Sequence, residues 1–252
     1  MFPIGDDNRD RTTTPYVNYA LIVLNILVFV FLQGMGENIG FTYAFSTVPQ
    51  EILSGEDLIT DDRIVQDPAS GQQFRVPGLQ PTPISVYITL FTAMFMHGGL
   101  GHLFGNLLYL WIFGDNLEDR LGHGRYLLFY LLAGLLASLA HVYASLLLGD
   151  NLQVPSLGAS GAISGVLGGY LLLFPRRRVT VIILRIITQV PAIVAVGLWF
   201  VFQLISGIGV LGSGSQLGGV AYAAHIGGFI AGFLLIKLFD PGPRQPLRGR
   251  SW

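Results

Sequence analysis

Six long apolar segments, separated by nearly all of the charged residues, constrain this chain more than any other feature of its sequence. They cover residues 16–33, 88–113, 125–148, 160–174, 190–210 and 219–239. A helix needs about 20 apolar residues to cross the ~30 Å hydrocarbon layer of a bilayer, and each segment reaches or approaches that length. Of the 252 residues, 52% are hydrophobic and only 12% are charged, which is typical of membrane proteins. We therefore predict an all-α, polytopic membrane protein, a bundle of six transmembrane helices.

The positively charged residues predict how this bundle is oriented, because cytoplasmic loops carry an excess of Lys and Arg. Six spans place both termini on one side, and that side then receives twelve of the fourteen Lys and Arg residues. The opposite side receives only Arg63 and Arg75. Both termini are therefore expected in the cytoplasm. The twelve residues are Arg9, Arg11, Arg120, Arg125, Arg176, Arg177, Arg178, Arg185, Lys237, Arg244, Arg248 and Arg250.

The same pattern predicts the domain organisation. We expect a cytoplasmic N-terminal tail (1–15), a six-helix membrane domain (16–239) and a cytoplasmic C-terminal tail (240–252). Residues 34–87 are expected to form a long first loop on the outward side. The tail at 1–15 has acidic residues and no apolar core, so no cleavable signal peptide is expected. A short, uncleaved N-terminus favours a bacterial plasma membrane.

Three boundaries follow from local composition. The second helix is expected to end near Gly114, followed by a short turn as far as Arg125. The β-branched stretch 179–189 is expected to lie at the membrane interface, with the fifth helix beginning near Pro191. The segment 160–174 is expected to be a short helix that opens on a serine.

Small residues recur at every fourth position in the fourth and sixth segments, so that each segment presents one small face as a helix. Such faces let two helices approach closely in lipid. We therefore expect these two helices to pack with their backbones close together. The residues are Gly161, Gly165 and Gly169 in the fourth segment, and Ala224, Gly228 and Gly232 in the sixth.

Polar side chains inside a bilayer are rare and are candidates for function. Counting about 1.5 Å per residue from the cytoplasmic helix ends places Ser160 at roughly 22 Å, and His102 and His225 at roughly 18 Å. A serine and two histidines from three helices are therefore expected at similar depth in the outer half of the membrane. The polar residues that we identify within the spans are His102, Asn106, His141, Ser160, Ser164 and His225.

A serine beside a histidine is the minimal pair for nucleophilic acyl transfer, because the imidazole takes the hydroxyl proton and later gives it to the leaving group. The developing oxyanion needs preorganised donors, and the Ser160 amide, His102 and Asn106 are available. No Asp or Glu lies at this depth in any span. The expected arrangement is therefore a Ser160–His225 dyad.

Four motifs agree with this arrangement. They are Gly158-Ala159-Ser160-Gly161, Ala224-His225-Ile226-Gly227-Gly228, His102-Leu-Phe-Gly-Asn106 and Glu118-Asp119-Arg120-Leu121-Gly122. In this order they resemble the rhomboid intramembrane serine proteases over about residues 88–239. The resemblance implies that Ser160 is the nucleophile, His225 the general base, and His102 and Asn106 the oxyanion donors, with Gly158, Gly161 and Gly228 supporting the motifs. It implies hydrolysis of transmembrane proteins, usually single-pass.

The chain departs from that family pattern at two places. Some members carry a tyrosine four residues after the serine, stacked on the histidine, where this chain has Ser164. Some carry a Trp-Arg pair in the first loop, where this chain has Ile88 and Thr89. The group that orients His225 is therefore left open, and a bulky neighbour from another helix is one candidate.

Other functions fit the sequence less well. A zinc site is disfavoured because an HExxH motif and an intramembrane carboxylate are both missing, so neither a metal nor a cofactor is expected. A transporter usually shows an inverted repeat, which we do not find. The basic run Arg176–Arg178 fits membrane topology, not nucleic-acid binding. The alternative that remains is a non-catalytic rhomboid-like protein that binds or routes membrane clients.

Overall fold

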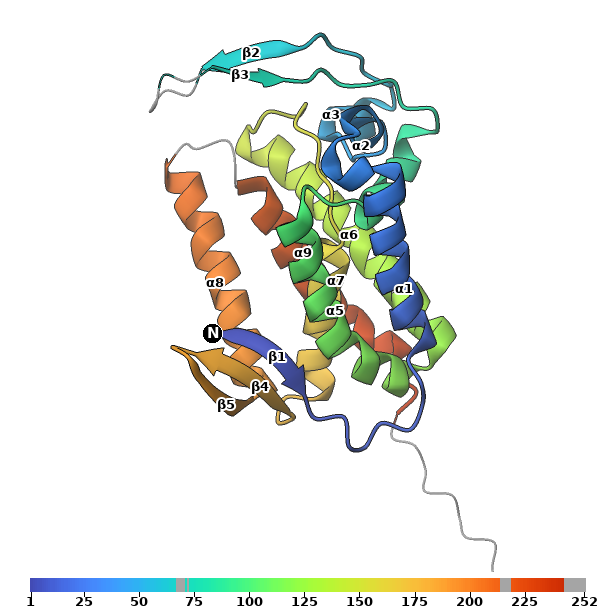
Figure 1. The fold of residues 1–252 in the computed structure, drawn as a ribbon, viewed down its shortest axis with the longest axis vertical. Helices are drawn as coiled ribbons and strands as arrows, with labels where there is room; N and C mark the ends of the chain where they lie inside the picture. Colours follow the sequence, from blue (N-terminus) through green and yellow to red (C-terminus); the bar gives the residue numbers. More distant parts are fainter. Residues whose placement is uncertain (67–70, 72, 214–218, 243–252) are drawn as a thin grey trace, which may run out of the picture.

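The computed structural model describes residues 1–66, 71, 73–213 and 219–242. Long helices form a bundle that stands between a small sheet at one end and a hairpin with short helices at the other (Figure 1). The helical bundle agrees with the prediction. The prediction of an all-α chain is wrong, however, because the described residues also contain strands β1–β5.

Within the described residues, six long or medium helices make up the bundle. Short helical turns precede α5 and fill part of the first loop. The bundle helices are α1 (Tyr16–Leu27, continued by the π-helical turn Val28–Leu32), α5 (Leu100–Leu121), α6 (His123–Leu148), α7 (Ser160–Leu173), α8 (Ala192–Ser213) and α9 (Gly219–Phe239). The short elements are α2 (Ile39–Ala44), α3 (Pro49–Ser54), α4 (Thr89–Thr92), and the 3-10 turns Gly34–Gly36, Val86–Ile88 and Ala93–Phe95.

Helix α7 is the centre of the bundle. It packs against α5, α6 and α9, and every residue from Gly161 to Tyr170 is buried. With 14 residues it is about 21 Å long, which is less than the ~30 Å hydrocarbon thickness. The helix is therefore shorter than a full transmembrane helix, and Ser160 is its first residue.

The second apolar segment is divided in the structure. Residues 86–95 form three consecutive helical turns, and α5 begins only at Leu100. It continues to Leu121, so the predicted end near Gly114 is wrong. Acidic residues of the predicted turn instead bind other parts of the chain: Glu118 accepts hydrogen bonds from the Val17 and Asn18 amides and so caps the start of α1.

Residues 2–6 and 178–191, far apart in sequence, form one antiparallel sheet. Strand β4 (Arg178–Ile183) lies between β1 (Phe2–Asp6) and β5 (Ile186–Pro191), with Phe2 opposite Ile182. Residues Leu184 and Arg185 both have positive φ, as a two-residue hairpin turn requires. The stretch expected at the interface is therefore a hairpin, and the N-terminal tail supplies the third strand.

The first loop, 34–87, contains α2 and α3 and a second hairpin, β2 (Arg63–Gln66) paired with β3 (Gln73–Val76). Figure 1 shows this hairpin above the end of the bundle that is opposite the sheet. Residues 67–70 and 72 of the predicted first loop and residues 243–252 of the predicted C-terminal tail fall outside the described residues, as do residues 214–218 between the fifth and sixth apolar segments.

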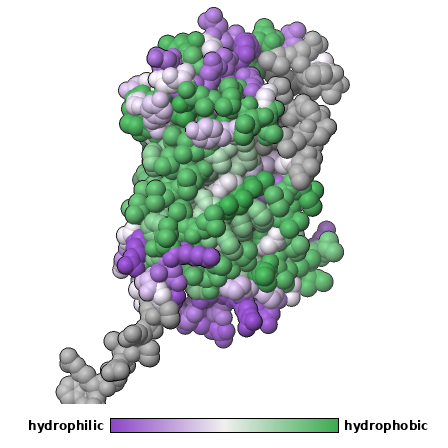
Figure 2. All heavy atoms as spheres, turned by 180° about the vertical axis from the view of Figure 1, so that it is seen from behind, coloured by the Kyte–Doolittle hydropathy of each residue, from purple (hydrophilic) through white to green (hydrophobic). Residues whose placement is uncertain are grey.

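Among the described residues, two helices are both long and apolar enough to cross a membrane, His123–Leu148 and Tyr222–Phe239. Four shorter helical stretches are apolar, Tyr16–Leu32, Val86–Phe95, Ser160–Leu173 and Ala192–Gly207. Figure 2 shows apolar side chains over the middle of one face, with hydrophilic side chains at its two ends. A surface of this kind suits contact with lipid.

Candidate active site

Ser160 and His225 meet between α7 and α9. Their side chains are joined by a hydrogen bond of 2.8 Å between Ser160 Oγ and His225 Nε2. Sixty-five positions separate the two residues in sequence. The two helices thus bring together a hydroxyl and an imidazole with the geometry that proton transfer requires.

Glycines allow α7 and α9 to approach this closely. A Cβ atom on Gly228 would lie 2.2 Å from the Gly161 carbonyl oxygen, and one on Gly232 would lie 2.0 Å from that of Gly165. Real side chains cannot occupy such positions, so the backbones themselves are in contact. The close approach predicted from the two small faces is therefore present.

The same face of α7 also contacts α6. A Cβ atom on Gly161 would lie 2.7 Å from Ala137 Cβ, and one on Gly165 would lie 2.4 Å from Ala133 Cβ. Helix α7 is thus fixed between two neighbours, and Ser160 is positioned by backbone packing.

His102 of α5 borders the serine. The Gly98 amide donates a hydrogen bond of 3.3 Å to His102 Nδ1, so Nε2 carries the proton in the neutral ring. A Cβ atom on Gly158 would lie 3.0 Å from His102 Nε2 and 3.5 Å from Ser160 Oγ, and Gly158 has a φ of +131°. Only glycine fits at this position, and it leaves the His102 Nε2–H beside the serine.

Asn106, one turn after His102, supplies a second donor. Its side chain is buried, and its Nδ2 atom has no hydrogen-bond partner among the described residues. An unpaired buried donor costs about 1–3 kcal/mol, and an anionic oxygen would satisfy it. The Ser160 amide, at the first position of α7, likewise has no carbonyl within its helix to bind.

Two cavities adjoin the hydroxyl. One of about 120 Å³ lies on the α6 side, where Gly134, Ala137, Gly158 and Gly161 line it. Another of about 240 Å³ lies between α5 and α8, and its lining includes Asn106, Trp199 and Gln203. Both contain Ser160, His102 and His225 in their walls.

The structure also places Gln203 of α8 against His225. Its Oε1 atom lies 2.9 Å from His225 Nδ1, and the side chain is 7% exposed. The set of polar residues expected within the spans lacks Gln203, although a glutamine in the apolar segment 190–210 met the same criterion. That criterion was the signal that could have found it.

The remaining polar residues have other surroundings. The Ser164 hydroxyl donates a hydrogen bond of 2.6 Å to the Ser160 carbonyl, an ordinary arrangement for a helical serine. His141 is buried in the wall of the 120 Å³ cavity. The His97 ring meets the His102 ring edge-on, with 5.2 Å between the ring centroids. The Gln33 side chain accepts a hydrogen bond from the His97 backbone amide and donates one to the His97 backbone carbonyl.

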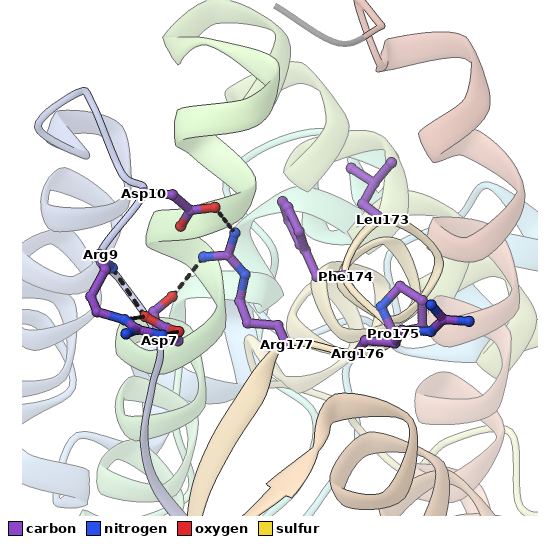
Figure 3. A pocket seen from close by; sticks show the side chains of 8 residues that line it. All are labelled: Asp7, Arg9, Asp10, Leu173, Phe174, Pro175, Arg176 and Arg177. Carbon is purple, nitrogen blue, oxygen red and sulfur yellow. Dashed lines mark hydrogen bonds and ion pairs between the residues drawn. The ribbon is translucent and has the colours of Figure 1, made fainter.

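A cavity of about 820 Å³ lies at the sheet end, beyond the last turn of α7 (Figure 3). Arg177 donates to the Asp7 carbonyl and to Asp10, and hydrogen bonds from Arg9 lower the pKa of Asp7 to about 2. Ser160 is thirteen residues away along α7, or roughly 20 Å. These ion pairs fasten the N-terminal segment and take no part in the dyad.

No group of three or more His, Asp or Glu side chains in the described part of the chain is placed to hold a metal ion.

Comparison with known proteins adds independent evidence. The family model described as "Rhomboid domain" matches residues 85–240. Rhomboid protein 1, mitochondrial, of Saccharomyces cerevisiae is 33% identical over 156 residues, which is 62% of this chain and 43% of the yeast protein. Rhomboid protease GluP of Bacillus subtilis is 29% identical over 221 residues, 87% of this chain and 34% of GluP.

RHOMBOID-like protein 4 of Arabidopsis thaliana is 37% identical over 153 residues, 58% of this chain and 32% of the plant protein. The matches thus span between about a third and two fifths of these relatives' own lengths. The family model itself covers well over half of this chain and includes α5 through α9. The chain belongs to the rhomboid family of integral membrane proteins.

Proposed function

We propose that this chain is an intramembrane serine endopeptidase that cleaves transmembrane proteins. The observation that supports this most directly is the 2.8 Å hydrogen bond between Ser160 Oγ and His225 Nε2. The similarity to a bacterial relative named as a rhomboid protease supports it further.

In the proposed reaction, Ser160 Oγ attacks the carbonyl carbon of the scissile bond while His225 Nε2 takes its proton. The carbonyl oxygen becomes an oxyanion, which accepts hydrogen bonds from His102 Nε2–H, Asn106 Nδ2 and the Ser160 amide. His225 then gives its proton to the leaving amine. A water molecule, deprotonated by His225, hydrolyses the acyl-enzyme and restores the serine.

The proposed topology has α1, α5, α6, α7, α8 and α9 as six spans within residues 16–239, with residues 34–87 outside and both tails, 1–15 and 240–252, in the cytoplasm. The sheet end supports this orientation, because Arg9, Arg177 and Arg178 gather there. Single-pass proteins are the proposed substrates. The relatives include mitochondrial proteins, so they do not support a bacterial plasma membrane in particular.

Two substitutions test the dyad. Ser160→Ala and His225→Ala should each abolish cleavage of a model transmembrane substrate in proteoliposomes while the melting curve stays unchanged. Ser164→Ala is the matched control, because its hydroxyl lies one turn away and bonds only the backbone; it should retain activity. Cleavage by Ser160→Ala at the wild-type rate would refute the proposal.

Labelling with a serine-directed fluorophosphonate distinguishes a protease from a non-catalytic protein that binds membrane clients. A protease should be labelled at Ser160, and labelling should disappear in His225→Ala because the hydroxyl is no longer activated. A protein that binds membrane clients without cleaving them would remain unlabelled.

A further inference from the structure

Gln203 is the starting point. It is a buried amide in the apolar helix α8, and its Oε1 atom lies 2.9 Å from His225 Nδ1. The other imidazole nitrogen, Nε2, lies 2.8 Å from Ser160 Oγ. One side chain from each of α8, α9 and α7 therefore forms a continuous chain of hydrogen bonds.

In this hydrogen-bonded series, the Gln203 amide determines which nitrogen of the His225 ring carries the proton. A neutral imidazole has one N–H donor and one acceptor nitrogen. An amide oxygen can only accept, so it holds the proton on Nδ1 and leaves Nε2 free to accept from the serine hydroxyl. The opposite tautomer would place a proton on Nε2, between the base and the hydroxyl that it must deprotonate.

Other neighbours of the His225 ring cannot favour one tautomer over the other. Trp199 and Tyr222 lie 6.3 and 6.4 Å from the His225 ring, measured between centroids, and limit its tilt. Aromatic contacts do not distinguish the two nitrogens. The titratable side chains lining the adjoining cavities are His102 and Tyr109 of α5 and His141 of α6, and these linings contain no carboxylate.

We infer that Gln203 is a positioning residue that fixes the tautomer and orientation of His225, so that α8 supplies a neutral third member to the Ser160–His225 pair. This inference rests on the proposed peptidase activity. It also answers how His225 is oriented in a chain that has Ser164 where a stacking tyrosine occurs in some members.

Two variants divide the possible roles. Gln203→Leu keeps a similar volume and removes the acceptor, so kcat should fall roughly tenfold or more, the size of effect that losing an outer hydrogen-bond partner has at metal-binding histidines, with KM nearly unchanged. Gln203→Glu keeps an acceptor, so it should retain most of the activity. Its carboxylate would also favour the imidazolium, which should shift the acidic limb of the kcat profile to higher pH.

Phe202→Leu is the matched control on α8, because Phe202 is adjacent in sequence and 61% exposed; its kcat should equal that of the wild type. A Gln203→Leu enzyme with unchanged kcat would overturn the inference. Equal losses in Gln203→Leu and Gln203→Glu would also overturn it, since the amide nitrogen and not the oxygen would then face the ring.

A second measurement does not depend on catalysis. In protein labelled with ¹⁵N-histidine, the His225 signals should show the Nδ1–H tautomer, and Gln203→Leu should shift them toward the Nε2–H form. The same tautomer in both proteins would contradict the role of Gln203. A protein that shows the expected tautomer but neither cleaves substrate nor labels at Ser160 would instead refute the proposed function alone.

Discussion

Helix α9 has two very different neighbours. Against α7 its backbone is in direct contact, with Gly228 and Gly232 lying over the Gly161 and Gly165 carbonyls. Against α8 it makes side-chain contacts, such as the stacked rings of Phe200 and Phe229 at 4.1 Å. The first interface joins Ser160 and His225, whereas the second brings Gln203 to His225.

This difference indicates a division of roles. Backbone contact leaves no room for adjustment, so the distance between Ser160 and His225 is fixed by the fold. Side-chain contact can be made and lost at small cost, and one face of α8 is exposed at Leu198, Phe202 and Ile205. The Ser160–His225 pair lies on the close interface, and Gln203 lies on the adjustable one.

The largest expected effect comes from adding a methyl group to the close interface. In Gly232→Ala the new Cβ would meet the Gly165 oxygen at 2.0 Å, so α7 and α9 must separate, at a cost of about 1–3 kcal/mol of unfolding free energy. Cleavage and fluorophosphonate labelling should both fall sharply. Gly197→Ala on α8 is the control, because nothing lies within 4 Å of its added Cβ. Equal melting temperatures of Gly232→Ala and Gly197→Ala would contradict the conclusion that α7 and α9 are in backbone contact.

A smaller effect is expected at the adjustable interface. Phe200→Ala removes an aromatic pair that contributes about 0.5–1.5 kcal/mol beyond its buried area, so the melting temperature should fall less than in Gly232→Ala. Because the dyad distance does not depend on α8, kcat should fall no further than in Gln203→Leu. A complete loss of labelling by fluorophosphonate in Phe200→Ala would show that α8 also holds the serine and histidine together.

The smallest effect on cleavage is expected at the far end of α7, where the test asks whether this end is also held in place. There Asp6 Oδ2 accepts hydrogen bonds from the Tyr170 hydroxyl and Asn116 Nδ2. Burial raises the pKa of Asp6 to about 7, although the hydrogen bond from Tyr170 opposes the shift. An unfolded aspartate has a pKa of about 3.9, so between these values the folded protein binds a proton that the unfolded protein lacks. Stability should therefore decrease as pH rises from about 4 to 7.

Asp6→Asn can still accept both hydrogen bonds but does not titrate, so it should weaken this pH dependence. Melting temperatures at several pH values in detergent measure the effect. Asp10→Asn, whose parent side chain is 69% exposed, is the control. An identical pH dependence in Asp6→Asn and the wild type would exclude Asp6 as its source.

Much of the bundle followed from the sequence because its signals are local. The apolar segments beginning at residues 16, 125, 160 and 219 correspond closely to α1, α6, α7 and α9. The spacing of the small residues indicated that α7 and α9 pack closely, and depth alone placed Ser160 and His225 at one level. The structure joins these two side chains.

What the sequence did not indicate depends on distant partners. The stretch 178–191 forms a hairpin, and Phe2–Asp6, more than 170 residues earlier, pairs with it as a third strand. Helix α5 extends to Leu121 because Glu118 and Asp119 bind the residues around the start of α1. The depth of His102 was therefore counted from Gly114, although α5 ends at Leu121. The place of His102 beside the serine depends on Gly158. Gln203 was missed because a single amide leaves an apolar segment otherwise unchanged.

The short length of α7 determines how far Ser160 lies from the sheet end. Its last residue, Leu173, lies at the sheet end, and fourteen residues of rise set the height of the hydroxyl above that level. Inserting one residue below Ser160 would raise the hydroxyl by about 1.5 Å and rotate it by about 100°, away from α9. The depth of the Ser160 hydroxyl and the direction in which it points are consequently coupled, and in the proposed protease neither can change without the other.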